Sequence, residues 1–185
     1  LYEDIKMRLN TEQELQQAIR EDQFLIYYQP RVQTQTGKLL GIEALIRWQH
    51  PTRGLVLPND FIGLAEETDL IHPIGELVVD KVCAQLASWL KQGVEAVPVS
   101  VNVSPHQFNE GKVKKSLAAS LAKHGIPASL LEIELTESAM MRNIGDIFDE
   151  LTAINEMGIK VHVDDFGTGY SSLSLLQRLD MDILK

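Results

Sequence analysis

Along this chain, segments with the apolar pattern of a strand alternate with segments that have the apolar pattern of a helix. Short runs of alternating or continuous apolar positions are typical of buried strands, and longer stretches with apolar residues every three or four positions are typical of helices. The predicted strands are residues 24–30, 39–48, 97–105, 130–138, 160–165 and 181–185. This alternation predicts an α/β fold, and strands of this kind can close into a barrel that gathers their ends in one mouth.

Helix boundaries are marked by capping and helix-breaking residues. Thr11 with Glu14 forms a capping box, which predicts a helix from residue 11 to about residue 21. Pro73 opens a long helix that Gly93 ends, with apolar residues at helical spacing between them. Further helices are predicted over residues 111–124, 144–157 and 172–179, the first two ended by Gly125 and Gly158.

Several predicted strands carry a polar side chain that a buried strand tolerates only where a partner or a ligand satisfies it. Taken singly, each of these residues is more consistent with a strand end or a cap. The five candidates are Glu43, Asn102, Glu134, Asp164 and Asp165. Five such side chains at corresponding strand ends are hard to explain as independent caps. Carboxylate and amide oxygens suit hard divalent cations such as Mg²⁺, so together they predict a metal site.

Asp164 and Asp165 stand where the strand at 160–165 opens into a turn that contains Gly167 and Gly169. Adjacent carboxylates favour metal binding, and the two glycines permit a tight turn. This motif alone leaves a second interpretation open, in which the two aspartates only cap the turn.

Six motifs resemble, in order and approximate spacing, those of the EAL-domain phosphodiesterases, a bacterial family that hydrolyses cyclic di-GMP. The motifs are YYQP (27–30), EALIRW (43–48), SVNVSP (100–105), ELTES (134–138), DDFGTGYSSL (164–173) and LK (184–185). Together they fall within residues 13–185. Six ordered motifs are far more specific than any one of them.

The resemblance implies a two-metal hydrolase that uses Mg²⁺ or Mn²⁺, because a metal pair neutralises the phosphodiester and activates water. Glu43, Asn102, Glu134 and Asp164 resemble the ligands of one ion. Asp164 with Asp165 resembles the link to the second ion. Glu43 and Asp164 are therefore also candidate catalytic residues.

Four further residues match functional positions of the family. Gln29 and Arg47 resemble its substrate contacts, and the forked donors of Arg47 suit a phosphate or a guanine edge. Glu137 resembles the residue that anchors the DDFGTG loop, which in the family joins the metal site to a homodimer interface. Lys185 resembles the lysine that holds or activates the attacking water.

The family's fold is a TIM-like (β/α)8 barrel, which typically needs about 250 residues. With six predicted strands in residues 13–185, we expect an incomplete barrel in this chain, and the family's next strand carries a further Glu ligand. We accordingly expect negligible hydrolysis from residues 1–185 alone. Residues 1–12 resemble the helical connector that follows a GGDEF or sensory domain in this family.

Composition limits the classes of function. With 44% hydrophobic and 23% charged residues, the 185-residue chain fits one globular domain. A formal net charge of −9 without any basic run argues against DNA or RNA binding, and an acidic protein acting on an anionic dinucleotide needs cations in its site. A single cysteine, Cys83, excludes an internal disulfide. The lack of an internal disulfide, together with the usual location of the resembled family, favours a cytoplasmic domain. The parent protein can still be anchored to a membrane through another segment.

Two histidines and one tryptophan are candidates for structural roles. His50 is predicted to lie in a loop, and His162 fits a buried core position better than a ligand position. Cys83 and Trp48 are also predicted in the core, and for Trp48 a stacking role near the mouth, beside Arg47, stays open.

Three functions stay open from the sequence. The first is a cyclic di-GMP phosphodiesterase, and the second is a catalytically impaired relative that acts as a cyclic di-GMP receptor. The third is a barrel phosphoesterase for another substrate, which Gln29 and Arg47 disfavour. Every family ligand up to Lys185 is present, which favours the enzyme.

Overall fold

The computed structural model describes residues 2–109, 111–136, 144–164 and 183–184. Its strands are β1 (Phe24–Val32), β2 (Leu39–His50), β3 (Gly54–Val56), β4 (Val99–Asn102), β5 (Leu131–Thr136), β6 (Lys160–Asp164) and β7 (Ile183–Leu184). Its helices are α1 (Tyr2–Arg20), α2 (Ile62–Glu67), α3 (Ile71–Lys91), α4 (Lys112–His124) and α6 (Ile144–Glu156). Three short 3-10 turns lie at η1 (Pro58–Asp60), η2 (Pro105–Gln107) and η3 (Ala128–Leu130).

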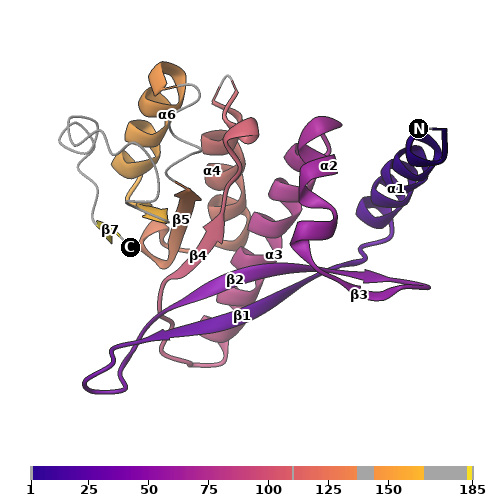
Figure 1. Cartoon of the computed structure of the whole chain (residues 1–185). Coiled ribbons are helices and arrows are strands. Elements are labelled where there is room, and N and C mark those ends of the chain that lie inside the picture. Colours follow the sequence, from indigo (N-terminus) through magenta and orange to yellow (C-terminus); the bar gives the residue numbers. More distant parts are fainter. Residues whose placement is uncertain (1, 110, 137–143, 165–182, 185) are drawn as a thin grey trace.

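The strands form one mixed sheet in the order β1-β2-β4-β5-β6-β7, with β3 added to β2. β1 and β2 are antiparallel and form the long ribbon seen in Figure 1, whereas β2, β4, β5, β6 and β7 run parallel. Along the chain, α3, α4 and α6 precede β4, β5 and β6 in the order that the sequence predicts, and the connection from β6 to β7 lies outside the described residues. Parallel strands bring their carboxyl ends to one edge, so residues near those ends share one region.

One face of the sheet packs against the helices and forms the hydrophobic core. The side chains of this face alternate along each strand, and they include Val99 and Val101 of β4, Ile133 of β5 and Val161 of β6, each at most 5% exposed. Tyr28 of β1 meets Trp89 of α3 edge-to-face, with ring centroids 5.3 Å apart. This packing fixes which side chains point to the opposite face.

We call the opposite face of the sheet the inner face. Its side chains alternate with those of the core, and their positions follow from the strand register. The inner face carries Gln29 and Arg31 of β1, Gly41 and Glu43 of β2, Ser100 and Asn102 of β4, Glu132 and Glu134 of β5, and His162 of β6.

The helix ends follow the predicted glycine signals. α4 ends at His124, directly before Gly125, and Gly158 lies two residues after the end of α6. Both glycines have a positive φ, 66° and 89°. A left-handed residue of this kind closes a helix with least strain when it is glycine. α3 begins at Ile71, so Pro73 lies in its first turn as expected. The helix predicted over residues 172–179 lies outside the described residues.

Two local predictions are wrong, and one short strand was missed. The capping box at Thr11 does not start a helix, because α1 runs without a break from Tyr2 to Arg20. β3 was not predicted, since a three-residue strand carries too little periodicity. His50 ends β2 instead of lying in a loop, and it is buried against the Trp48 ring.

The predictions of buried residues are confirmed. Trp48, Cys83 and His162 are at most 1% exposed. Among the helices of the described residues, none combines the length and the apolar character that crossing a bilayer requires. Whether residues 1–12 connect to an upstream domain stays a prediction.

Candidate active site

Three neighbouring strands present oxygen-bearing side chains on the inner face. Glu43 lies on β2, Asn102 ends β4 and Glu134 lies on β5. Asn102 is opposite Glu134 in the sheet register, and Glu43 is opposite Ser100, two residues before Asn102. The structure therefore places on one face the three predicted ligands whose side chains it describes.

The Asn102 amide is oriented by Glu43. Its Nδ2 donates a hydrogen bond to Glu43 Oε1 over 2.9 Å. A carboxylate at neutral pH only accepts hydrogen bonds, so the amide must turn its NH2 group to Glu43. The Asn102 oxygen consequently faces another direction, and an amide oxygen is a ligand for hard cations.

Arg31 of β1 reaches across the inner face to β5. Its Nη1 donates to Glu134 Oε1 over 3.2 Å, and its Nη2 donates to Glu132 Oε2 over 2.5 Å. The Glu134 side chain is 1% exposed, so this contact lies away from bulk water. A guanidinium is a suitable partner for two carboxylates because its forked donors are fixed in one plane.

Glu132 and His162 form a buried layer beside Arg31. His162 Nε2 lies 3.0 Å from Glu132 Oε2, and both side chains are almost fully buried. Burial raises the pKa of Glu132, but its interactions with His162 and Arg31 outweigh burial and leave this pKa below its ordinary value. Glu132 is therefore an ionised carboxylate at neutral pH.

The two predicted substrate contacts also lie on β1 and β2. Gln29 is paired with Glu43 in the antiparallel register and is exposed. The Arg47 guanidinium lies 5.6 Å from the centroid of the Tyr27 ring, and its Nη1 donates to the carbonyl of Ile46 over 2.8 Å. The exposed Tyr27 ring and the Arg47 guanidinium together offer a stacking face and a cation on the two strands that carry Gln29 and Glu43.

The other four predicted site residues have side chains outside the described part of the structure. Asp164 ends β6, where its backbone is opposite Thr136, and its side chain lies outside the described part. Asp165, Glu137 and Lys185 also lie outside the described residues. Their roles stay predictions.

A cavity of about 330 Å³ opens beside Asn102 and Glu134. Its walls are mainly apolar and come from β2, α2, α3 and the segment after β4, for example Ile46, Ile62, Ile74 and Val103. Glu66 provides a carboxylate in this wall, and Ser104 Oγ donates to Glu66 Oε1 over 2.6 Å. Mainly apolar walls with a few polar groups are typical of small-molecule sites.

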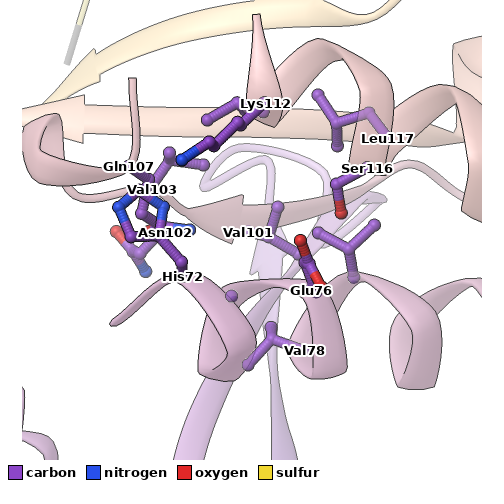
Figure 2. Close-up of a pocket in the computed structure, with 13 residues that line it drawn as sticks. His72, Glu76, Val78, Val101, Asn102, Val103, Gln107, Lys112, Ser116 and Leu117 are labelled. Carbon is purple, nitrogen blue, oxygen red and sulfur yellow. The ribbon is translucent and has the colours of Figure 1, made fainter. Parts of the chain in front are cut away.

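A second, smaller cavity lies between α3, β4 and α4, as Figure 2 shows. Asn102, His72, Gln107 and Lys112 gather at one end of it, and Glu76 lies at the other end. Its volume of about 20 Å³ is enough for about one water molecule. This cavity is therefore too small for a substrate.

The donor set of the inner face fits a hard divalent cation in its chemistry. Glu43 and Glu134 supply carboxylates and Asn102 supplies an amide oxygen, which are ligand types that Mg²⁺ and Mn²⁺ accept. Within the described side chains, no three His, Cys, Asp or Glu residues are grouped closely enough to hold a metal ion. Asp164 and Asp165, the carboxylates expected to complete the set, are not among those side chains.

Arg31 and Glu132 were not predicted from the sequence as residues of the site. Both residues occupy the inner-face parity of their strands, Arg31 two residues after Gln29 and Glu132 two residues before Glu134. That parity was the available signal. Their contact was not visible in the sequence, because 101 residues separate them.

Comparison with known proteins gives a consistent result. The sequence profile of the EAL domain matches residues 12–185. The chain is 41% identical over 172 residues to the bifunctional diguanylate cyclase/cyclic di-GMP phosphodiesterase MucR of Pseudomonas aeruginosa, covering 93% of this chain and 25% of MucR. It is 40% identical over 177 residues to the cyclic di-GMP phosphodiesterase NbdA of the same organism, covering 96% of this chain and 23% of NbdA. The chain thus spans about a quarter of these curated relatives.

Solved structures share the fold. The PaMucR phosphodiesterase in complex with c-di-GMP superposes with a TM-score of 0.87 at 41% identity, over 93% of this chain and 70% of that one. The Xanthomonas citri FimX EAL domain in complex with c-diGMP gives a TM-score of 0.88 at 26% identity, over 100% of this chain and 71% of that one. These matches confirm the predicted fold class, and the chain belongs to the EAL domain family, whose members include cyclic di-GMP phosphodiesterases.

Proposed function

We propose that this chain contributes the active site of a metal-dependent phosphodiesterase that hydrolyses cyclic di-GMP to linear pGpG. The observation that carries the proposal is the gathering of Glu43, Asn102 and Glu134 on one face of three neighbouring strands. Relatives at about 40% identity that are cyclic di-GMP phosphodiesterases support the same activity.

Each residue has a proposed role in the reaction. Glu43, Asn102, Glu134, Asp164 and Asp165 hold Mg²⁺ or Mn²⁺. When bound, the cations neutralise the phosphate charge and lower the pKa of the attacking water. Gln29 and Arg47 bind and orient the dinucleotide, Lys185 holds the attacking water, and Glu137 anchors the loop after Asp165.

The cavity of about 330 Å³ is suited to one guanine base of this substrate. Its apolar walls can cover the faces of a purine ring, and the Glu66 carboxylate matches the N1–H and N2–H2 donor edge of guanine. We expect Glu66→Gln to raise KM for cyclic di-GMP with a smaller effect on kcat, because it removes an acceptor that binds the ground state and transition state equally. An unchanged KM would exclude this base position.

The test of the proposed activity uses the full-length protein. We would incubate it with cyclic di-GMP and Mg²⁺ and separate the products by chromatography, with Ca²⁺ replacing Mg²⁺ in a parallel sample. We expect pGpG with Mg²⁺, and loss of product in Glu43→Gln, which keeps the shape of the side chain but removes its charge. Tight binding of cyclic di-GMP without product would instead make the protein a receptor, and neither binding nor product would refute the assignment.

The chain is also proposed to act within a larger assembly. It spans about a quarter of relatives such as the bifunctional MucR, which supports an upstream GGDEF or sensory domain. We further propose a homodimer through the loop after Asp165 and a cytoplasmic location, where the substrate is an intracellular messenger. Light scattering of the full-length protein tests the dimer, and a monomer under assay conditions would exclude it.

A further inference from the structure

Arg31 takes an unusual path for a residue of an edge strand. It belongs to β1, where it is paired with Gly41 of β2, yet its guanidinium contacts two carboxylates of β5. β2 and β4 lie between these strands in the sheet order. The side chain therefore lies along the inner face and crosses two strands before it reaches Glu132 and Glu134.

Gly41 makes this path possible. A Cβ atom placed at Gly41 would lie 2.6 Å from Arg31 Nη2 and 3.2 Å from Arg31 Cζ. The same atom would lie 3.1 Å from the backbone oxygen of Pro98, which leaves it little room to move aside. Ser100, the buried inner-face residue of the next strand, is also small. Small residues at these two positions thus leave room for the flat guanidinium.

The Arg31 guanidinium fixes the orientation of the Glu134 carboxylate on β5. Its two terminal nitrogens hold Glu134 and Glu132 at the same time, over 3.2 Å and 2.5 Å. Because the five donors of arginine lie in one rigid plane, the two carboxylates cannot turn independently. Residues that orient a metal ligand in this way typically change metal affinity about 10- to 100-fold when they are removed.

We propose that Arg31 is a positioning residue that holds the Glu134 carboxylate for the divalent cation, with Gly41 keeping its path open. This inference rests on the proposed function, because it assigns Arg31 to the same metal site. Arg31 itself does not contact substrate. The competing interpretation is that Arg31 only ties β1 to β5 and has no influence on the metal.

Binding of Mn²⁺ to the full-length protein, followed by the EPR signal of the free ion, separates these interpretations. We expect Arg31→Met to bind Mn²⁺ about 10- to 100-fold more weakly, and Arg31→Lys to recover part of the loss, since lysine supplies the charge without the fork. Ile133→Val is the control, because Ile133 lies between Glu132 and Glu134 but faces the core. It weakens the same strand and should leave Mn²⁺ affinity unchanged.

Gly41→Ala provides a second test that keeps Arg31 itself. We expect it to weaken Mn²⁺ binding in the same direction, and the double variant with Arg31→Met to be no weaker than Arg31→Met alone, because Gly41 acts through Arg31. If Arg31→Met fails to fold, Arg31→Lys and Gly41→Ala still decide the question. Unchanged or tighter Mn²⁺ binding in these variants overturns the inference and leaves the proposed function intact. A wild-type protein that binds no Mn²⁺ overturns both.

Discussion

Removing the Arg31–Glu132 ion pair should destabilise the sheet far more than removing a surface pair of similar length. Arg31 Nη2 lies 2.5 Å from Glu132 Oε2, and their side chains are 21% and 6% exposed. Lys81 Nζ lies 2.7 Å from Asp22 Oδ1, but these side chains are 28% and 69% exposed. Burial is therefore the main difference between the two pairs.

The expected magnitudes follow from that difference. Loss of one partner of a buried pair costs about 3–5 kcal/mol, and we expect Arg31→Met to lie near the lower limit because a fifth of its side chain is exposed. The coupling energy of Arg31→Met with Glu132→Gln should be about 1.5–3 kcal/mol. For Lys81→Met with Asp22→Asn it should be about 0–1 kcal/mol, since exposed pairs contribute little.

The coupling should also depend on pH. The folded-state pKa of Glu132 lies below its ordinary value of 4.5, so the ionised carboxylate contributes stability above about pH 4.5. This contribution is lost as the pH falls through the folded-state pKa. The Arg31–Glu132 coupling should accordingly be full at pH 7 and should decrease below pH 4.5.

Hydrogen exchange, detected by mass spectrometry over β1 and β5, measures the free energy of local opening of these strands in each variant. The method applies to the full-length protein as well as to residues 1–185. EDTA removes the contribution of bound metal, which would otherwise stabilise the folded state by mass action. Equal coupling energies for the two pairs, or a coupling that is unchanged at pH 3.5, would refute the argument from burial.

Three further predictions concern the core and the helix ends. Phe24 is fully buried, and its ring centroid lies 5.7 Å from that of Phe61. Phe24→Ala should therefore lower the free energy of opening by about 3–5 kcal/mol, and a loss below about 1 kcal/mol would contradict this packing. Burial raises the pKa of the Cys83 thiol to about 11, so about one thiol in a thousand is ionised at pH 8. Because the thiolate is the reactive form, the reaction of Cys83 with Ellman's reagent should be slow until denaturant is added. Gly125 has φ 66°, so Gly125→Ala should lower the opening free energy of α4 by about 1 kcal/mol and Gly125→Asn by less, as hydrogen exchange can measure.

The sequence predicted the sheet and most helices because their signals are local. Val99, Val101 and Ile133 are apolar at every second position, and this period alone separates the core face from the inner face. Helix ends at Gly125 and Gly158 were predictable for the same reason, since only the residue after the helix must adopt a positive φ.

The failures come from contacts that no local pattern contains. The capping box at Thr11 is a valid local signal, but residues before it continue the helix and override it. His50 stands before a proline and a turn, yet it pairs with Gly54 of β3, and this pairing extends β2 to His50. A sequence pattern indicates which secondary structure a segment favours, and contacts with other segments decide where two conformations are nearly equal in energy.

The same division explains which parts of the site were predictable. Glu43, Asn102 and Glu134 were found because carboxylates and amides are conspicuous in apolar strands. Arg31 was not, since an arginine near the end of an exposed edge strand is ordinary. Its significance appears only once its partners on β5 are known.

The charges on the inner face give a physical reason for a cation at this site. One guanidinium, Arg31, faces two carboxylates, Glu132 and Glu134, and the interactions of Glu132 with His162 and Arg31 hold its pKa below the ordinary value. Glu43, the third carboxylate, has an uncharged amide as its neighbour. Gathering three carboxylates on one face, two of them buried, is costly unless further positive charge balances them. A divalent cation held between Glu43, Asn102 and Glu134, as proposed above, would supply that balance and would also attract an anionic phosphodiester, which the net charge of −9 would otherwise repel. Arg31 therefore neutralises part of the charge of Glu132 and Glu134, and the proposed metal would neutralise the remainder together with the charge of Glu43.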